Sequence, residues 1–200
     1  MTTDHTANPW LTLSSETYHE DKYLRLDVDQ VRHQSGVEHP YTAVRFKVFG
    51  LTVLPIDDAG RTFLVGQYRY LLDRYLWELP RGGGAVDVPP IETAKRELAE
   101  ETGHSAAHWF ELPKLTASPE ITSEWAPCYI AWGLCPISAE ADPQESLSIR
   151  RLPFGEAVNA VLAGEVVDAA SVALLLGTAE RARRGQLPQD LTALLGTGGL

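Results

Sequence analysis

The stretch Arg96-Glu97-Leu98-Ala99-Glu100-Glu101-Thr102-Gly103 places three carboxylates beside an arginine. On an α-helix, which turns by about 100° per residue, Glu97, Glu100 and Glu101 lie within an arc of roughly 100°. Like charges three and four residues apart repel one another on a helix, so this face needs a compensating charge. A solvated acidic surface is one interpretation, and a site for a hard divalent cation such as Mg²⁺ is the other. Taken alone, the stretch favours the solvated surface, but the flanking sequence reverses that preference.

The flanking residues predict that this stretch ends a helix and that a glycine-rich loop precedes it. Pro90 suits the first helical position and Gly103 suits a C-terminal stop, so the helix is expected to run from Pro90 to Glu101 or Thr102. Upstream, Pro80-Arg81-Gly82-Gly83-Gly84 interrupts the strand pattern and predicts a loop whose backbone can approach a ligand closely. The loop matches neither the Gly-x-x-x-x-Gly-Lys-Ser/Thr pattern nor the Gly-x-Gly-x-x-Gly pattern.

The composition is that of an ordinary globular chain. Of its 200 residues, 44% are hydrophobic and 22% charged, which suits one domain with a small appended element. The formal net charge of -10 argues against nucleic acid or an anionic membrane as the main partner. The start of the chain lacks a signal-peptide pattern, and no apolar run approaches the roughly 18 residues of a membrane span. The two cysteines, Cys128 and Cys135, show no Cys-x-x-Cys spacing, so the expected location is a reducing cytoplasm.

Extended patterns occur on both sides of the acidic helix. Residues 23–28 and 41–46 alternate in polarity, and the turn-rich Gln34-Ser35-Gly36 between them predicts a hairpin. Because strands come before, between and after helices, we expect an α/β (α+β) fold in which a mixed sheet carries helices on both faces. Further strands are predicted at 51–56, 62–70, 76–79, 111–116 and 129–134.

The C-terminal part of the chain is predicted to be helical. One helix is expected from Phe154 to Ala163, and a second from an N-cap at Asp168 to Arg183. Residues 186–200 are expected to form a tail, in part disordered, with room for a short turn of helix near its middle.

The glycine-rich loop and the acidic helix together resemble the signature of the Nudix hydrolases, Gly-x5-Glu-x7-Arg-Glu-U-x-Glu-Glu-x-Gly-U, where U is apolar. Two positions depart from it, since Val88 replaces the first glutamate and His104 replaces an apolar residue. In the family that glutamate chiefly braces the loop through the arginine, so Asp87 or Glu92 could pair with Arg96 instead. The positions that match in register are Gly82, Arg96, Glu97, Leu98, Glu100, Glu101 and Gly103.

The similarity extends to the ADP-ribose pyrophosphatase-like subfamily. Residues 65–70 and 77–80 look like the segments that precede the signature in that subfamily. Pro119 lies at about the spacing beyond the signature that marks the ADP-ribose subgroup. The segment 117–124 resembles the catalytic loop of the subfamily, although Glu120 stands where glycine is usual.

The resemblance implies a Nudix-type α/β/α sandwich with a mixed sheet over residues 48–185. The small N-terminal β region, 1–47, is expected to help form a homodimer, as it does in the subfamily. Residues 186–200 would follow as a C-terminal tail.

The resemblance also assigns roles to individual residues. Glu97, Glu100 and Glu101, together with the backbone carbonyl of Arg81, are expected to hold Mg²⁺, with Mn²⁺ as an alternative. Glu97 and Glu101 are therefore counted as catalytic. Glu124 ends the catalytic loop and is expected to act as general base, with a metal ligand or an inert loop residue as the alternatives.

Three further residues are expected to bind the substrate. Arg69 would grip a phosphate, although a surface arginine on a strand is an equally good interpretation. Glu78 would orient the substrate or a metal-bound water, and the alternative is that it closes a sheet edge. Pro119 would contribute from the catalytic loop.

The implied reaction is Mg²⁺-dependent attack of water on the pyrophosphate bond of ADP-ribose or a related nucleoside diphosphate sugar. Metal ions would neutralise the phosphates, orient them and acidify the water, and the products would be a nucleoside monophosphate and a sugar phosphate. The alternatives are a hydrolase of GDP-mannose-type nucleotide sugars and a non-catalytic Nudix module that senses ADP-ribose. Non-catalytic versions usually lose glutamates of the signature, and this chain retains all three of the helix.

Overall fold

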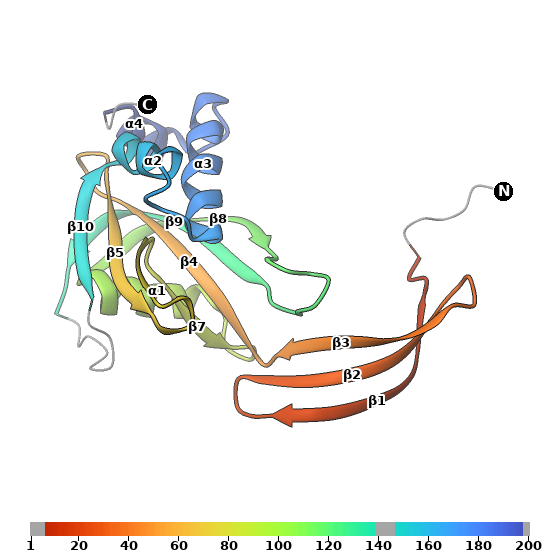
Figure 1. The fold of residues 1–200 in the computed structure, drawn as a ribbon. Coiled ribbons are helices and arrows are strands. Elements are labelled where there is room, and N and C mark those ends of the chain that lie inside the picture. The colour runs from red at the N-terminus through yellow and green to blue at the C-terminus, as the bar shows by residue number, and fades with distance from the viewer. Residues whose placement is uncertain (1–6, 139–146, 198–200) are drawn as a thin grey trace. The chain divides into compact units, whose positions relative to one another are not determined.

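A computed structural model describes residues 7–138 and 147–197 of the chain and divides it into two compact units (Figure 1). The first unit comprises the chain up to Val48 together with Thr116–Glu124, and the second comprises Phe49–Leu115 and the chain from Trp125 onward. The segment 116–124, which the sequence grouped with the central domain, thus clusters with the N-terminal strands. Within the described residues, no helix has the length and apolar character needed to cross a membrane.

From residue 7 onward, the first unit forms an antiparallel sheet of three strands. Its order is β1 (Trp10–Glu20), β2 (Leu24–His33) and β3 (Glu38–Phe46). The predicted hairpin is confirmed, because Gly36 turns the chain between β2 and β3 at a φ of 90°. The segment Thr116–Glu124 runs beside β3, where the amide of Val44 donates to the Ile121 carbonyl at 2.8 Å.

In its described residues, the second unit contains two sheets and four α-helices. One sheet has the order β10-β5-β6 and the other the order β7-β4-β9-β8, in which β4 and β9 are parallel and β8 and β9 antiparallel. The strands are β4 (Val48–Ile56), β5 (Arg61–Arg69), β6 (Arg74–Glu78), β7 (Arg81–Ala85), β8 (His104–Leu115), β9 (Ala126–Pro136) and β10 (Ser148–Pro153). The helices are α1 (Pro90–Thr102), α2 (Phe154–Leu162), α3 (Ala169–Arg183) and α4 (Gln189–Thr197), and a short 3-10 helix, η1, spans Tyr70–Leu72.

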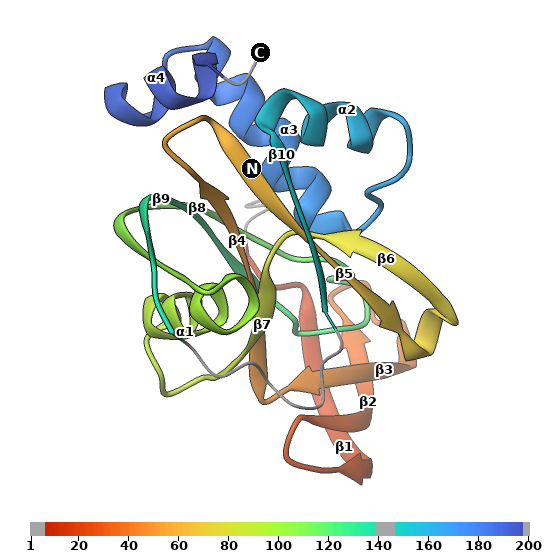
Figure 2. The same ribbon diagram turned by 90° about the vertical axis from the view of Figure 1, so that its left-hand side faces the viewer.

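The four-stranded sheet lies between two helical layers (Figure 2). Successive side chains of a strand point to opposite faces, and β4 and β9 are buried on both. The α1 face carries Phe49, Leu51, Val53, Tyr129 and Ala131, which pack with Ala94 and Leu98 of α1. The opposite face carries Leu54, Ile56, Cys128, Ile130 and Trp132, which share a core with residues of α2, α3 and α4. This arrangement confirms the predicted α/β/α sandwich with a mixed sheet.

The predicted helix ends are also confirmed. The α1 helix runs from Pro90 to Thr102 and is capped by Gly103, whose φ of 69° is left-handed and suits a glycine. The α3 helix begins at Ala169, and the side chain of the preceding Asp168 accepts a hydrogen bond from the amide of Ser171 as an N-cap does.

Two parts of the second unit differ from the sequence-based expectation. The glycines 82–84 do not form a loop but belong to strand β7, which pairs with β4. The segment expected as a tail contains helix α4, whose Leu191 and Leu195 are fully buried in the core. The side chain of Trp132 donates to the Asp190 carboxylate at 2.8 Å, which fixes the start of α4 against β9.

Candidate active site

The acidic face of α1 is turned toward strand β7. Because Ala94 and Leu98 anchor the helix on the sheet, the side chains of Glu97 and Glu101 are carried to the flank that faces β7. Both residues are buried, with exposed fractions of 7% and 3%. Glu100 lies on the outer flank, and its side chain is 30% exposed. The structure therefore brings two of the three predicted carboxylates into a buried position and leaves the third at the surface.

The glycines of β7 allow this strand to approach α1 closely. A side chain at Gly82 would overlap the carboxylate of Glu97, and a Cβ at Gly84 would lie 2.6 Å from the hydroxyl of Thr93. A side chain at Gly82 would displace the Glu97 carboxylate, and one at Gly84 would also overlap the ring of the buried Phe49, so glycine at these positions keeps β7 close to α1. The role of these glycines is thus close packing of strand and helix rather than loop flexibility.

Arg96 supplies the positive charge that the acidic face needs. Its guanidinium contacts Glu97 at 2.5 Å and Glu100 at 2.6 Å, and it also donates to the carbonyl of Gly83 at 3.1 Å. Partial burial opposes the charge of Arg96, but the two carboxylates outweigh it and raise the pKa of the guanidinium.

The prediction that Asp87 or Glu92 pairs with Arg96 is wrong. Glu92 pairs instead with Lys95 at 2.8 Å, and the Arg96 guanidinium is held by its own helix and by β7. The strand–helix connection is therefore braced through the Gly83 carbonyl, which needs no glutamate at position 88.

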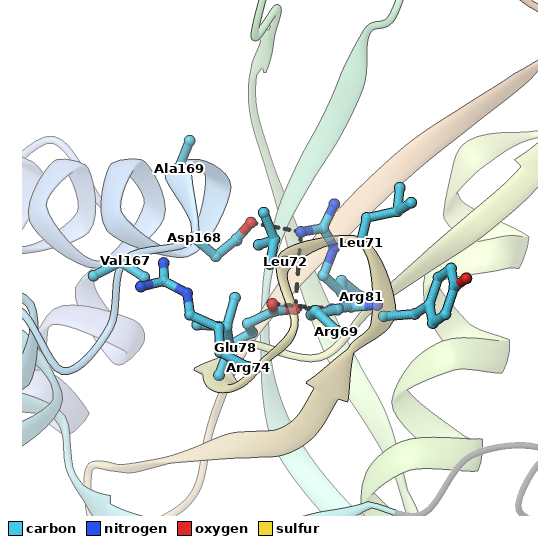
Figure 3. A pocket seen from close by; sticks show the side chains of 11 residues that line it. Arg69, Leu71, Leu72, Arg74, Glu78, Arg81, Val167, Asp168 and Ala169 are labelled. Atoms are coloured by element: carbon cyan, nitrogen blue, oxygen red, sulfur yellow. Dashed lines mark hydrogen bonds and ion pairs between the residues drawn. The ribbon is translucent and has the colours of Figure 1, made fainter.

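Arg81 links the acidic helix to a cavity on the other side of β7. Its backbone amide donates to Oε2 of Glu101 at 3.0 Å. Its guanidinium points into the cavity, where it contacts Oδ1 of Asp168 at 2.5 Å and lies 3.8 Å from Oε2 of Glu78 (Figure 3). One residue thus joins the buried carboxylate of α1 to the polar side of the cavity.

The cavity has a volume of about 580 Å³ and combines charged and apolar walls. Arg69 forms a two-pronged ion pair with Glu78, whose side chain is only 2% exposed, and this contact raises the pKa of Arg69 (Figure 3). The remaining wall is largely apolar. The lining residues are Arg69, Tyr70, Leu71, Leu72, Arg74, Leu76, Glu78, Arg81, Val167, Asp168 and Ala169. The two predicted substrate-binding residues Arg69 and Glu78 therefore meet Arg81 in one place.

Two residues at or beside the cavity, Asp168 and Ser171, are not among the site residues that the sequence predicts. Asp168 was expected only as a helix cap, and Ser171 was not singled out. Ser171 is fully buried, and its hydroxyl accepts from the amide of Leu79 at 2.9 Å and donates to Asp168 at 2.8 Å. Asp-Ala-Ala-Ser after an extended segment was the available signal, because it marks a helix N-terminus, but it does not reveal which strand that terminus meets.

The predicted metal ligands have suitable chemistry but are not gathered around one point. Hard cations such as Mg²⁺ prefer carboxylate and carbonyl oxygens, which Glu97, Glu100, Glu101 and Arg81 offer. Among residues 7–138 and 147–197, however, no three acidic, histidine or cysteine side chains form a group that could hold a metal ion. In this arrangement Arg96 contacts two of the three carboxylates. The chemistry of the donor set therefore fits a hard cation.

Pro119 and Glu124 belong to the first unit. Pro119 lines a small cavity of about 130 Å³ there, beside Tyr41 and Arg45 of β3. The same segment is tied to β3 by the Tyr41 hydroxyl, which donates to the Glu120 carbonyl at 2.5 Å. Pro119 and Glu124 thus cluster with the N-terminal strands. The predicted roles of Pro119 in substrate binding and of Glu124 as general base remain predictions.

Comparisons with known proteins agree with this fold. No family model matches the chain. The chain is 37% identical over 178 residues to the ADP-ribose pyrophosphatase of Mycobacterium tuberculosis, a match that covers 82% of this chain and 81% of that protein. It is 28% identical over 167 residues to the ADP-ribose pyrophosphatase of Bacillus subtilis, covering 79% of this chain and 86% of that protein.

A solved structure described as an ADP compounds hydrolase has the same fold. It aligns with a TM-score of 0.80 at 23% sequence identity, over 90% of this chain and 98% of that one. At this identity the match speaks for the fold, whereas the mycobacterial relative identifies the family.

Proposed function

The chain belongs to the Nudix hydrolase family, among its ADP-ribose pyrophosphatase-like members, and from this premise we propose that it hydrolyses the pyrophosphate bond of ADP-ribose. The observation that carries the proposal is the double attachment of Arg81, whose amide is bonded to Glu101 of the acidic helix and whose guanidinium lies in the arginine-lined cavity. A diphosphate needs both features, because its two negative charges must be neutralised while water attacks.

In the proposed reaction, a water oxygen attacks one phosphorus atom and the bond from that phosphorus to the bridging oxygen breaks. The bridging oxygen leaves with the other phosphate, so the products are AMP and ribose 5-phosphate. Glu97, Glu101, Glu100 and the carbonyl of Arg81 would hold Mg²⁺ or Mn²⁺. When bound, this cation supplies charge neutralisation and lowers the pKa of the attacking water.

The cavity residues would bind the substrate beside this centre. We assign Arg69 and Arg81 to the phosphates because their guanidinium groups converge on Glu78 in one wall of the cavity. Glu78 holds both arginines in a fixed orientation, which pre-organises them for a planar, two-point contact with phosphate oxygens. The apolar wall is suited to the uncharged parts of a nucleotide sugar.

Glu124 would accept the proton of the attacking water, and Pro119 would shape the loop that carries Glu124. Both assignments rest on the match of residues 117–124 to the catalytic loop of the subfamily. We further propose that the protein works in the cytoplasm and that its N-terminal unit forms the contact of a homodimer. The three exposed large side chains Trp10, Leu11 and Leu13 of β1 are consistent with such a contact.

The experiment that tests the function is a substrate panel with separated products. The protein is incubated with Mg²⁺ and ADP-ribose, GDP-mannose, UDP-glucose or a dinucleoside polyphosphate, and the products are resolved by chromatography. We expect ADP-ribose to give AMP and ribose 5-phosphate at the highest kcat/KM, and to give none in excess chelator. Faster turnover of GDP-mannose than of ADP-ribose would contradict the proposed substrate and favour a GDP-mannose-type hydrolase. Tight binding of ADP-ribose without turnover would contradict enzymatic activity and favour a non-catalytic sensor.

A further inference from the structure

The connection between β6 and β7 is held at three points by two helices. On the α3 side, the amide of Leu79 donates to the Ser171 hydroxyl at 2.9 Å, and the Arg81 guanidinium contacts Oδ1 of Asp168 at 2.5 Å. On the α1 side, the amide of Arg81 donates to Glu101 at 3.0 Å. Residues 79–81 are thus hydrogen-bonded both to the N-terminus of α3 and to the C-terminal turn of α1.

Asp168 does more than a helix cap requires. Capping uses one carboxylate oxygen, and here Oδ2 accepts from both the amide of Ser171 at 2.9 Å and its hydroxyl at 2.8 Å. The second oxygen, Oδ1, is aimed at Arg81 and not at the helix. The side chain is only 12% exposed, so this contact is poorly screened by solvent.

We propose that Asp168 is a positioning residue for the hydrolysis, which acts by fixing the orientation of Arg81, with Ser171 as its support. This inference rests on the proposed function, in which the Arg81 carbonyl is a metal ligand. Strand β7 and Glu101 hold the backbone of Arg81, and the contact with Asp168 anchors the far end of its side chain. The two attachments together restrain Arg81 between α1 and α3 and so limit the movement of its carbonyl relative to α1.

The contacts of Asp168 argue for positioning and against a direct catalytic role. Oδ1 is engaged by Arg81, and Oδ2 by two groups of Ser171. A carboxylate with both oxygens occupied is poorly placed to take a proton from water. Groups that orient a ligand from behind typically contribute about 10–100-fold to metal affinity or activity.

The test compares three single variants. Asp168→Asn keeps an oxygen for the helix cap, since asparagine caps as well as aspartate, but it removes the charge that faces Arg81. Ser171→Ala removes the acceptor of the Leu79 amide. Glu180→Gln is the matched control, because it removes a carboxylate from the same helix whose ion pairs, with Arg183 and Arg184, are at the surface.

Four measurements are made on each purified variant. They are the melting temperature, kcat and KM for ADP-ribose, the Mg²⁺ concentration for half-maximal rate, and amide hydrogen exchange in the peptide that contains residues 79–83. We expect Asp168→Asn to melt close to the wild type, to lose about 10–100-fold in kcat, and to need a higher Mg²⁺ concentration. Exchange in the 79–83 peptide should rise by about tenfold through local opening. Glu180→Gln should change none of these.

The double variant Asp168→Asn with Arg81→Met isolates the contact. If the aspartate acts through the arginine, the double variant is no slower than Arg81→Met alone. Additive losses, or wild-type Mg²⁺ dependence and wild-type exchange in Asp168→Asn, would overturn the proposal.

If the wild type does not hydrolyse ADP-ribose, the proposed function fails instead. The hydrogen-exchange data then still test whether Asp168 restrains Arg81, because unchanged exchange of the 79–83 peptide in Asp168→Asn contradicts that restraint. If Ser171→Ala fails to fold, Asp168→Asn and the double variant carry the test.

Discussion

Two groups of arginines and carboxylates flank strand β7, and they are built in different ways. The helix group, Arg96 with Glu97 and Glu100, comes from a single helix and is partly open, since the Arg96 side chain is 48% exposed. The cavity group, Arg69, Glu78, Arg81 and Asp168, comes from β5, β6, β7 and the residue before α3. Its Glu78 is 2% exposed and its contacts are held by the fold.

This difference implies a division of tasks. Ion pairs that are open to solvent contribute little to stability, and in the helix group this applies to the pair of the half-exposed Arg96 with Glu100, which can exchange with water or another cation. Buried pairs are costly to break, because the partner left behind keeps an uncompensated charge. The cavity group is therefore suited to hold a fixed shape for the substrate, and the helix group to accept a metal.

The largest expected effect comes from Glu101, which joins the two groups through Arg81. We expect Glu101→Gln to remain folded and to lose about 10²–10⁴-fold in kcat, the range of a positioned acid–base or metal-binding group. Steady-state rates with ADP-ribose and Mg²⁺ measure the effect. The control is Glu92→Gln, on the same helix but exposed and paired with Lys95. A Glu101→Gln variant as fast as the wild type would remove this residue from the site.

Within the cavity group, Arg69→Met is expected to affect binding and stability together. Among the described residues it leaves the buried Glu78 with Arg81 alone, at 3.8 Å, so we expect a loss of about 2 kcal/mol in unfolding free energy. KM for ADP-ribose should rise by about 10–100-fold, because a two-point phosphate contact is lost. Arg74→Met is the matched control. Arg74 lines the same cavity and is exposed, and no ion pair to it is found among the described residues. Equal effects of both variants would contradict the special role of the Arg69–Glu78 pair.

Within the helix group, Arg96→Met should have a smaller effect on stability. The Arg96 side chain is half exposed and its pair with Glu100 is open to solvent, whereas Glu97 is buried, so we expect a loss of about 1 kcal/mol in chemical denaturation. The rate should fall by about tenfold, because the Gly83 carbonyl loses its brace and the carboxylates of Glu97 and Glu100 repel one another. Arg96→Lys restores the charge but not the forked contact, and it should recover only part of the rate. A destabilisation as large as that of Arg69→Met would mean that the two groups do not differ as described.

The smallest effect is expected away from both groups, at Asp57. Burial alone would raise the pKa of this carboxyl, but hydrogen bonds from Arg61, Arg151 and Ala59 outweigh it and hold the pKa below the ordinary 3.8. A depressed pKa stabilises the fold above the unfolded value, and this contribution disappears as the pH falls through the folded pKa. Asp57→Asn should therefore flatten the loss of stability below about pH 4 in denaturant titrations. If the unfolding free energy of Asp57→Asn falls as steeply below pH 4 as that of the wild type, Asp57 is not the source of the acid sensitivity.

The sequence predicts the helix group better than the cavity group for a physical reason. Partners three and four residues apart on one helix must meet, so the crowding of Glu97, Glu100 and Arg96 follows from helical geometry. The helix limits follow from Pro90 and Gly103 in the same local way. Even here the brace to the Gly83 carbonyl was missed, because it depends on how closely β7 approaches α1.

The cavity group depends on sheet register and on helix placement, which local patterns do not encode. Arg69 and Glu78 could be singled out, but their ion pair follows from the antiparallel pairing of β5 with β6. Asp168 was predicted as an N-cap without its contact to Arg81. Strands β1 and β10 and the burial of Leu191 and Leu195 were also missed, since they rest on partners distant in the sequence.

The metal site is tested most directly by the position of Mn²⁺ in a crystal grown with AMP, located by anomalous scattering. We expect a peak within coordination distance of Glu97, Glu101 and the carbonyl of Arg81, with Arg96 displaced from Glu97. Arg69 and Arg81 should contact the phosphate of AMP. No peak between α1 and β7 at saturating Mn²⁺, with Arg96 still in contact with Glu97, would contradict the claim that this helix binds the metal of a pyrophosphatase.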